Sequence, residues 1–405
     1  MGAHDVYQDP LVGRYTDKEM QYIFSEEFKF TTWRRCWIAL AESQMELGLK
    51  QITPEMVDEL KKAQTTIDYN TAKEKEKEIR HDVMAHVYEY GLHCPKAKGI
   101  IHLGATSQFV CCNTDLIQIK EALKIIKKGI INTINNLTKF AEEHKALVTL
   151  GYTHYQPAQP TTIGKRITLY IQDLILDLKR LEFPILARGV KGTTGTQASY
   201  MELFNNYEKV KELDKLVSEK LGFKNSFPIT GQTYTRKFDT IVAKALAGIA
   251  ESAHKFAVDM RLMSNLKIME EPFAKSQTGS SAMAYKRNPM RSERMTALSR
   301  KLMNLQLDFS HIHSNQWFER TLDDSSIRRI DIPQAFLLAN AILKLYQNIT
   351  DGMVVYPAQI KKYLNEELPF MATEVILMEL AKQGYDRQEM HEIIKKHSID
   401  AGKVV

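Results

Sequence analysis

Cysteine is scarce in this sequence, and no apolar run is long enough to cross a membrane. The four cysteines, Cys36, Cys94, Cys111 and Cys112, lack the spacing of metal ligands, and the last two are adjacent, which suits buried thiols better than a disulfide framework. The N-terminus has no apolar signal core, and no segment reaches the ~18 apolar residues that a membrane span requires. We therefore expect a cytoplasmic protein with reduced thiols.

The usual nucleotide-binding motifs are also missing. Residues 189–196 are rich in glycine without being a Walker A sequence, and Gly164-Lys165 is followed by Arg166 where that motif has serine or threonine. Strand signals are weak throughout, and no dinucleotide fingerprint appears. These absences argue against an NTP site.

Charge gives little support to a nucleic-acid function. The formal net charge is +6 over 405 residues, with no long block of one sign. Such a mildly basic chain fits a small polyanionic substrate better, provided that its arginines cluster in particular motifs.

Long amphipathic segments are what the sequence does contain. From Asp115, apolar residues recur at intervals of three and four over roughly thirty residues, which corresponds to about 45 Å of helix. Similar segments cover about 161–183, 236–268, 291–315 and 326–349, with Pro184 as a break after the first and Pro333 expected to kink the last. Five such helices predict an all-α bundle whose exposed apolar stripes are covered by partner chains.

Shorter helices are expected in the first hundred residues. Either Thr16 or Asp17 is a candidate cap for a helix that ends near Phe30, and Thr53 precedes a helix with Pro54 at its first position.

Capping residues and prolines suggest the remaining helix boundaries. Asn113, Thr114 and Asp115 offer capping chemistry for the first long helix. After residue 352, shorter helices are expected around Pro357 and Pro369.

Polar connectors between the helices carry the candidate functional residues. Segment 279–290 combines two hydroxyls, a flexible glycine, two cations and a carboxamide, so it is either a loop that carries chemistry or a solvated surface loop. His154 lies in a turn punctuated by prolines and is a candidate for a proton donor or for a helix cap. Segment 319–329 is rich in arginine, or is simply a helix N-terminus capped by Ser325.

A second histidine lies in an earlier connector. His81 and His86 are five residues apart, which does not put two metal ligands on one helix face. The triplet Arg80-His81-Asp82 is better suited to bind an anion, with the aspartate orienting the imidazole.

Together these connectors resemble the motifs of one enzyme family. Residues 279–290 closely resemble the signature loop of the fumarase/aspartase superfamily, and Arg291-Ser292-Glu293-Arg294 is similar to the adenylosuccinate lyase family within it. Further segments that resemble this family, in order, are 80–86, 104–107, 153–159, 191–199 and 319–325. The resemblance extends from about Arg14 to the end of the chain.

The resemblance implies a fold of three helical domains with a central bundle of long helices. Its expected divisions are 1–106, 107–350 and 351–405, the last domain apparently shortened. It also implies a homotetramer whose active sites are shared between subunits, and it implies no metal or organic cofactor, no nucleic acid and no membrane.

The implied reaction is a C–N lyase reaction of purine biosynthesis. Fumarate would be eliminated from adenylosuccinate to give AMP, and from the succinylated aminoimidazole carboxamide ribotide (SAICAR) to give AICAR. The proton removed lies beside a carboxylate and is weakly acidic, so the intermediate needs strong electrostatic stabilisation. Another fumarate-releasing enzyme, above all an argininosuccinate lyase, and a catalytically silent relative are the alternatives.

By resemblance, Ser280 is the general base and His154 is the general acid. Ser281 is the alternative base. His81 is expected beside His154, and the roles of the two histidines could be exchanged. Lys286 contributes to catalysis by holding the substrate carboxylate.

The substrate carries a phosphate and two carboxylates, so several cations and hydrogen-bond donors are expected around it. The residues that match the family's binding positions are Arg14, Tyr15, Arg80, His81, Asp82, Thr106, Ser107, Gln232, Lys286, Asn288, Arg294, Arg320, Ser325 and Arg329. Ala284 stands where the family usually has proline, which predicts a less rigid loop.

Overall fold

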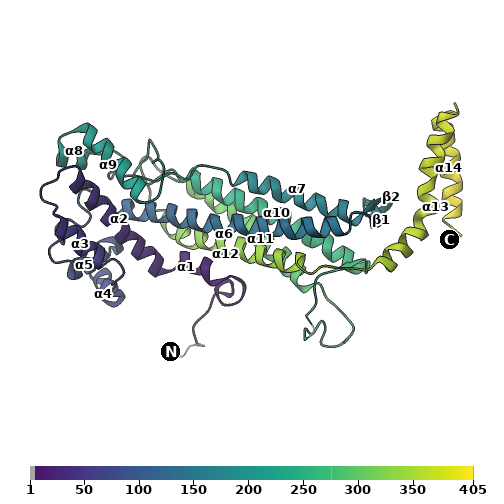
Figure 1. Ribbon diagram of the computed structural model, residues 1–405, viewed down its shortest axis with the longest axis horizontal. Helices are drawn as coiled ribbons and strands as arrows, with labels where there is room; N and C mark the ends of the chain where they lie inside the picture. The colour runs from purple at the N-terminus through teal and green to yellow at the C-terminus, as the bar shows by residue number, and fades with distance from the viewer. Residues whose placement is uncertain (1–4, 275, 405) are drawn as a thin grey trace. The chain divides into compact units, whose positions relative to one another are not determined.

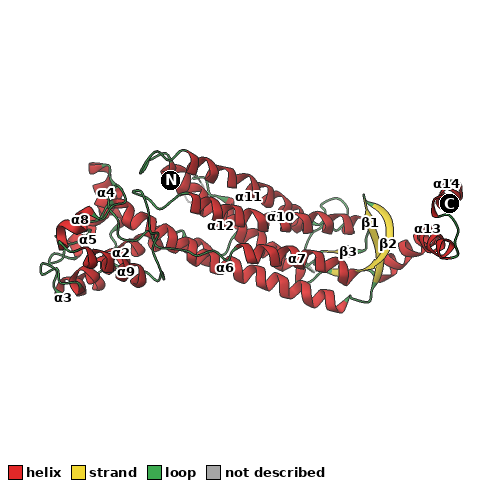
Figure 2. Cartoon of the chain, turned by 90° about the horizontal axis from the view of Figure 1, so that it is seen from above, coloured by secondary structure: helices red, strands yellow, loops and turns green. Residues whose placement is uncertain are grey.

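The computed structural model describes residues 5–274 and 276–404 as a chain made mainly of helices (Figure 2). In chain order the elements are the π-helical turn η1 (Leu11–Tyr15), α1 (Lys18–Ile23), α2 (Glu26–Glu46), α3 (Pro54–Lys62), α4 (Tyr69–Ile79), α5 (Asp82–His93), α6 (Ser107–Glu143), β1 (Val148–Thr153), β2 (Gln156–Thr162), α7 (Ile163–Arg180), α8 (Ala198–Phe204), α9 (Tyr207–Lys220), α10 (Lys237–Asn265), β3 (Met269–Glu270), α11 (Met290–Ser314), α12 (Asp324–Thr350), β4 (Val354–Val355), α13 (Pro357–Lys382) and α14 (Arg387–Ala401).

All five predicted long helices are present, as α6, α7, α10, α11 and α12. The predicted capping role of Asn113, Thr114 and Asp115 is wrong, because α6 already begins at Ser107 and these residues lie inside it. Asn113 is fully buried, and its side-chain amide donates to the Phe109 carbonyl over 2.8 Å. A polar residue inside a buried helix was thus mistaken for a helix start.

The N-terminal caps are partly as expected. Asp17 caps α1 by accepting from the Met20 N–H over 3.0 Å, and Thr53 caps α3 with Pro54 at its first position. The predicted helix end near Phe30 is wrong. The first helix ends earlier, at Ile23. The Ser25 hydroxyl then caps α2, a separate helix that continues to Glu46.

Two further expectations fail. Pro369 does not separate short helices but lies inside the 26-residue α13, because one proline removes a single helical N–H and a long helix can accommodate that loss. The weak strand signals concealed an antiparallel hairpin of β1 and β2, in which Thr153 pairs with Gln156. Prolines in β2 hid this strand from a reading based on propensity.

The chain forms two compact units. Unit 1 comprises residues 1–130, 177–251 and 297–344, and unit 2 comprises residues 131–176, 252–296 and 345–405. Their boundaries fall inside the five long helices. The division into three domains at residues 106 and 350 stays a prediction.

Unit 1 gathers the short helices around α2. In this unit α2 packs against α3 and α9, α4 against α5, and α8 against α9 (Figure 1). Aromatic side chains fill the core, and the rings of the fully buried Trp33 and Trp37 are 6.4 Å apart. Burial of such large side chains is the main source of this unit's stability.

Unit 2 contains both two-stranded sheets. The β1–β2 hairpin packs against α13, which also contacts α14, while β3 pairs with β4. Phe256 joins Tyr170 and Tyr346 in its core, with ring centroids 5.2 and 4.5 Å apart. Within the described part of the chain, none of the helices combines the length and the apolar character needed to cross a membrane.

Candidate active site

A cationic cleft lies in unit 1 at the start of α12. Its cavity volume is about 70 Å³. Three of the predicted binding residues, Arg320, Ser325 and Arg329, line it. The other lining residues are Lys29, Gln108, Cys111, Asp115, Arg236, Asp324 and Arg328. Five lining cations against two lining carboxylates make the cleft suitable for an anionic ligand.

Hydrogen bonds connect Arg320 to two other predicted residues. Its Nη1 donates to the Gln232 side-chain oxygen over 2.9 Å, and the Gln232 amide donates to the Thr106 hydroxyl over 3.0 Å. The Gln232 backbone N–H also donates to the Glu319 carbonyl over 3.0 Å. Gly231 approaches Glu319 so closely that a Cβ there would strike its carbonyl group. The segment around Gln232 and the segment around Arg320 are therefore held together by backbone as well as side-chain contacts.

A second group joins His81, Asp82 and Arg329. Arg329 Nη2 lies 2.7 Å from Asp82 Oδ2. Partial burial alone would raise the pKa of the Asp82 carboxyl, but the Arg329 charge and the Val83 backbone N–H hold that pKa below its usual value. Asp82 therefore carries a negative charge beside Arg329 at neutral pH.

His81 caps α5, which fixes the state of its ring. Its Nδ1 accepts from the Met84 N–H over 3.3 Å, so Nδ1 carries no proton in this contact and Nε2 is left as the donor. Just before it, Arg80 ends α4 with a left-handed φ of 55°. The predicted anion-binding triplet thus sits between two helices with its imidazole oriented.

The remaining predicted residues of unit 1 lie in η1, at the start of α6 and in α12. Arg14 and Tyr15 lie in the η1 turn, and Ser107 begins α6. Ser325 lies in the first turn of α12 rather than at its cap, because the helix already begins at Asp324.

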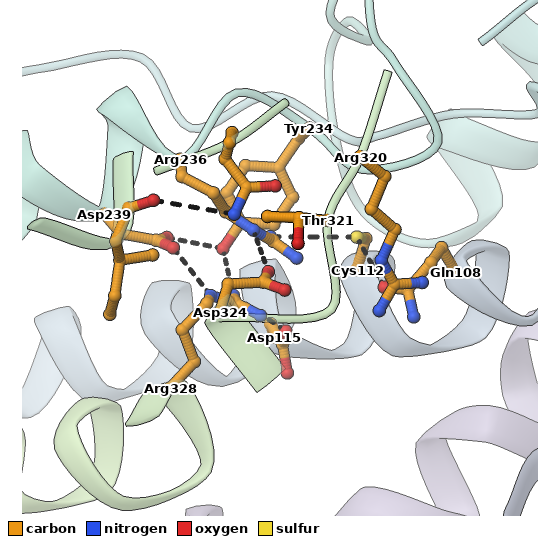
Figure 3. A network of polar contacts seen from close by, with 12 residues as sticks. Gln108, Cys112, Asp115, Tyr234, Arg236, Asp239, Arg320, Thr321, Asp324 and Arg328 are labelled. Atoms are coloured by element: carbon orange, nitrogen blue, oxygen red, sulfur yellow. Dashed lines mark hydrogen bonds and ion pairs between the residues drawn. The ribbon is translucent and has the colours of Figure 1, made fainter. Parts of the chain in front are cut away.

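The cleft is lined in part by a network of buried charges that sequence reasoning missed (Figure 3). Arg236 Nε donates to Asp324 over 2.7 Å, and Arg328 Nε donates to Asp239 over 2.8 Å. One signal could have revealed it. Asp324 and Arg328 are four residues apart, so they share one helix face, and each directly precedes a predicted binding residue.

The predicted general acid lies in unit 2 at the tip of the β1–β2 hairpin. His154 and Tyr155 form its two-residue turn with φ values of 53° and 60°. Left-handed backbone costs a residue with a side chain roughly 1–2 kcal/mol, so glycine or asparagine is usual at such positions. His154 is exposed and α7 begins only at Ile163, which excludes the helix-cap alternative. A strained, exposed histidine favours a functional role.

The predicted base lies in a loop of unit 2, described from residue 276 to 289 without helix or strand. The Ser280 hydroxyl oxygen accepts from the Met283 N–H over 3.1 Å and from the Ala282 N–H over 3.4 Å. Asn288 closes the foot of the loop by donating to the Gly279 carbonyl over 2.8 Å. Lys286 and Ala284 are exposed.

Gly279 is needed at this foot because of close packing. A Cβ there would strike the Lys286 carbonyl and lie 2.9 Å from the Phe273 ring. No left-handed φ is involved, so glycine is required by space and not by backbone conformation. The sequence had suggested a flexible glycine, whereas the structure shows a tight contact.

Two anchors that sequence reasoning missed hold the loop. Arg287, a candidate cation of the loop, lies 3.3 Å from the Glu270 carboxylate and 5.1 Å from the Phe273 ring centroid, so its charge is already engaged. Glu271 is buried and accepts from the backbone N–H groups of Arg291 and Ser292 over 3.0 and 2.9 Å. It thereby caps the start of α11, which carries the half-buried Arg294.

The described residues contain no group of three or more His, Cys, Asp or Glu side chains that could hold a metal ion. All four cysteines are free, and three of them are buried.

Two family models match the chain. The model described as a lyase covers residues 2–304, and the model described as the C-terminus of adenylosuccinate lyase covers residues 369–405.

Curated relatives match over the whole length of the chain. The adenylosuccinate lyase of Saccharomyces cerevisiae is 52% identical and that of Schizosaccharomyces pombe 51%, each over 411 residues that span 100% of this chain and 85% of the relative. The adenylosuccinate lyase of Schistosoma mansoni is 49% identical over 99% of this chain and 85% of its own.

Solved structures share the fold at lower identity. A fumarate lyase from Mesorhizobium sp. BNC1 has a TM-score of 0.83 at 21% identity, covering 98% of this chain and 88% of its own. The 3-carboxy-cis,cis-muconate lactonizing enzyme from Pseudomonas putida also has a TM-score of 0.83, at 22% identity, covering 96% and 87%. These likenesses confirm the all-α fold of the fumarase/aspartase type.

Proposed function

This chain belongs to the adenylosuccinate lyase family, and from that premise we propose how its residues perform the reaction. The activity is that of a C–N lyase that eliminates fumarate from adenylosuccinate and leaves AMP, a step of purine biosynthesis. The observation that carries this function is about 50% identity to adenylosuccinate lyases across the whole chain. SAICAR, which presents the same succinyl group and a similar ribotide phosphate, is the second substrate.

The cleft of unit 1 binds the nucleotide end of the substrate. Ser325 and Arg329 hold the phosphate together with Arg320, Arg14 and Tyr15. Several of these side chains are arginines, whose planar guanidinium groups form paired hydrogen bonds with phosphate oxygens. The remaining residues of this role, which also belong to unit 1, are Arg80, Asp82, Thr106, Ser107 and Gln232.

The reacting succinyl group is handled by unit 2. Ser280 acts as an alkoxide, having first lost its hydroxyl proton, and takes the proton beside the carboxylate to become the hydroxyl again. The two backbone N–H groups that point at this oxygen stabilise the negative charge on which its basicity depends. Lys286, Asn288 and Arg294 hold the substrate carboxylates, and Asn288 exchanges its bond to Gly279 for one to the substrate.

His154 donates a proton to the departing nitrogen, which breaks the C–N bond and releases fumarate. A neutral-range titration suits histidine to this step. His81, whose Nε2 is the free donor, contacts the substrate carboxylate or phosphate and supports His154.

A homotetramer with shared active sites completes the proposal. Exposed apolar residues on α7 support it, since Leu169, Ile175 and Leu176 are 42%, 40% and 52% exposed on one chain. Co-expression of a Ser280→Ala chain with an Arg329→Gln chain should restore part of the activity in mixed tetramers. No recovery with this or any other pair of site variants would contradict shared sites. The cytoplasmic location expected for such an enzyme remains part of this proposal.

The deciding experiment follows fumarate release from adenylosuccinate, argininosuccinate and malate in parallel. Release from adenylosuccinate alone, abolished by His154→Gln, supports the proposal. Release from argininosuccinate instead would assign the chain to that lyase. No release from any of the three by a folded protein would support a silent relative.

A further inference from the structure

The first two turns of α12 present alternating faces. Ser325 and Arg329 line the cleft, and the Arg329 side chain is 60% exposed. Their immediate neighbours Asp324 and Arg328 also line the cleft but are only 1% and 7% exposed. Because residues four apart share a helix face, Ser325 and Arg329 lie on a more exposed face of this helix, while Asp324 and Arg328 lie on the adjacent face and are paired inside the protein.

Asp324 and Arg328 are held by residues that precede or begin α10 (Figure 3). Arg236 pairs with Asp324, with both side chains 1% exposed. Tyr234 links the second pair, because its hydroxyl donates to Asp239 Oδ1 over 2.5 Å and accepts from Arg328 Nη2 over 2.7 Å. Arg328 Nη2 also donates to Asp115 over 2.9 Å.

Stability alone is a poor reason for such a network. Buried ion pairs gain little over well-packed apolar residues of similar size, because the cost of removing both charges from water offsets their attraction. What they do provide is direction, since each bond of a guanidinium has a fixed geometry. Arg328, held by Asp239, Tyr234 and Asp115, and Arg236, held by Asp324, therefore define the orientation of the helix turn that they contact.

We propose that Tyr234, Arg236 and Asp239 are positioning residues for nucleotide binding. Acting through Asp324 and Arg328, they hold the first turns of α12 so that the Ser325 hydroxyl and the Arg329 guanidinium face the phosphate. This inference rests on the proposed role of the cleft in binding the nucleotide.

The test is Tyr234→Phe, which removes one hydroxyl and leaves the buried ring. We expect the KM for adenylosuccinate and the inhibition constant of AMP to rise about tenfold, because the Arg328 side chain loses one of its fixed partners. The kcat should stay within about twofold, since no group that touches the reacting atoms changes.

Tyr170→Phe is the matched control. Tyr170 is also buried, and its hydroxyl also donates to an aspartate, Asp259, over 2.9 Å, but it belongs to unit 2 and is not among the residues that line the cleft. It should lower the unfolding temperature without changing KM. Asp239→Asn is a second test variant in case Tyr234→Phe does not fold, because it keeps the size of the side chain and weakens the hold on Arg328.

The outcomes are distinct. A raised KM for Tyr234→Phe or Asp239→Asn, with Tyr170→Phe unchanged, supports the inference. A lower unfolding temperature with an unchanged KM in every variant overturns it and leaves the network a structural role only. Arg329→Gln tests the proposed role of the cleft in binding the nucleotide separately from the positioning role of the network. An unchanged KM and AMP inhibition for that variant would overturn the role of the cleft itself.

Discussion

The two units hold their functional side chains in opposite ways. In the cleft of unit 1, the charges of Arg236 and Arg328 are buried and paired with carboxylates. In unit 2, the Lys286 and His154 side chains are exposed and the Ser280 hydroxyl is half-buried. The groups that would recognise the nucleotide are thus supported from beneath, while the groups that would react stand on a loop and a hairpin tip.

The fixed points of unit 2 lie beside its reacting groups. Arg287 is bound to Glu270, and Glu271 caps α11 next to the loop. These contacts hold the two ends of the loop and leave its middle exposed. Binding of the nucleotide and the chemical step should therefore respond differently to mutation of the two units.

Replacement of the base should have the largest effect. Ser280→Ala removes the proposed proton acceptor, so we expect kcat to fall by about 10²–10⁴-fold. AMP should still inhibit, or bind in calorimetry, with unchanged affinity because the cleft of unit 1 is intact. The measurement is fumarate release together with AMP titration.

The adjacent hydroxyl is the control for this variant. Ser281 is exposed, and Ser281→Ala should change kcat by no more than a few-fold. If Ser281→Ala gave the larger loss, the assignment of the base would move to that residue. If Ser280→Ala also abolished AMP binding, the separation between the units would be broken.

The foot of the loop should be the next most sensitive place. Gly279→Ala introduces a Cβ against the Lys286 carbonyl and the Phe273 ring, so Ser280 and Lys286 must move apart. A misplacement of about 1 Å costs roughly 10²-fold in rate. We expect a loss of kcat of this size in the fumarate assay, with AMP inhibition unchanged.

A glycine in open space provides the comparison. Gly99 has no atom within 4 Å of the position that a Cβ would occupy, and it belongs to unit 1, so Gly99→Ala should leave kcat unchanged. Equal rates for the two alanine variants would show that the tight contact at Gly279 has no part in catalysis.

Sequence reasoning located helices better than contacts. Apolar periodicity over twenty or more residues is a strong signal, and all five long helices begin and end within a few residues of the prediction, apart from the start of α6. The hairpin at 148–162 was missed because its prolines and polar residues resemble a loop. Only pairing between the strands, which no local pattern reveals, distinguishes the two.

In the candidate site, too, the sequence does not reveal which side chains contact one another. A match to family motifs identified Ser280, His154 and Arg329, but charge pattern could not tell which arginines meet a ligand and which are anchors. Arg287 and Arg328 look like further binding cations in the sequence, yet each is held by carboxylates in the structure. That distinction depends on partners from distant segments, such as Asp239 for Arg328.

One buried carboxyl of unit 1 lies beside another acid and not beside an arginine. Burial, reinforced by the neighbouring Asp308, raises the pKa of Asp331 to about 6, while Lys301 acts in the opposite direction. At a pH below 3.8, the ordinary pKa of this carboxyl, the folded and unfolded chains both keep the proton, and the stability contribution of the group is intact. As pH rises toward 6 only the unfolded chain releases it, so stability falls.

Asp331→Asn removes this dependence because the amide cannot ionise. We expect the variant to unfold at higher denaturant concentration than the wild type at pH 8, by on the order of 2 kcal/mol, and to lose most of that advantage near pH 4. Asp324→Asn, which breaks the pair with Arg236, should instead destabilise at pH 8. An equal response of both variants would remove the distinction between paired and unpaired buried acids.

The smallest expected effect on stability comes from relieving left-handed backbone strain. It can be relieved at one position outside the site and at one position in it. Lys267 follows α10 in unit 2 with a left-handed φ of 55°, and its side chain is exposed. Lys267→Gly should therefore raise the free energy of unfolding by about 1 kcal/mol, because glycine adopts this conformation without the clash of a Cβ. Its kcat should equal that of the wild type. His154→Gly relieves the same kind of backbone strain at the hairpin tip and should stabilise the fold by a similar amount, but with the loss of the proton donor its kcat should collapse. Unfolding curves and fumarate release measured on both variants decide the matter. If the His154→Gly protein kept its activity, the strained turn of unit 2 would have no catalytic role and another residue would be the general acid.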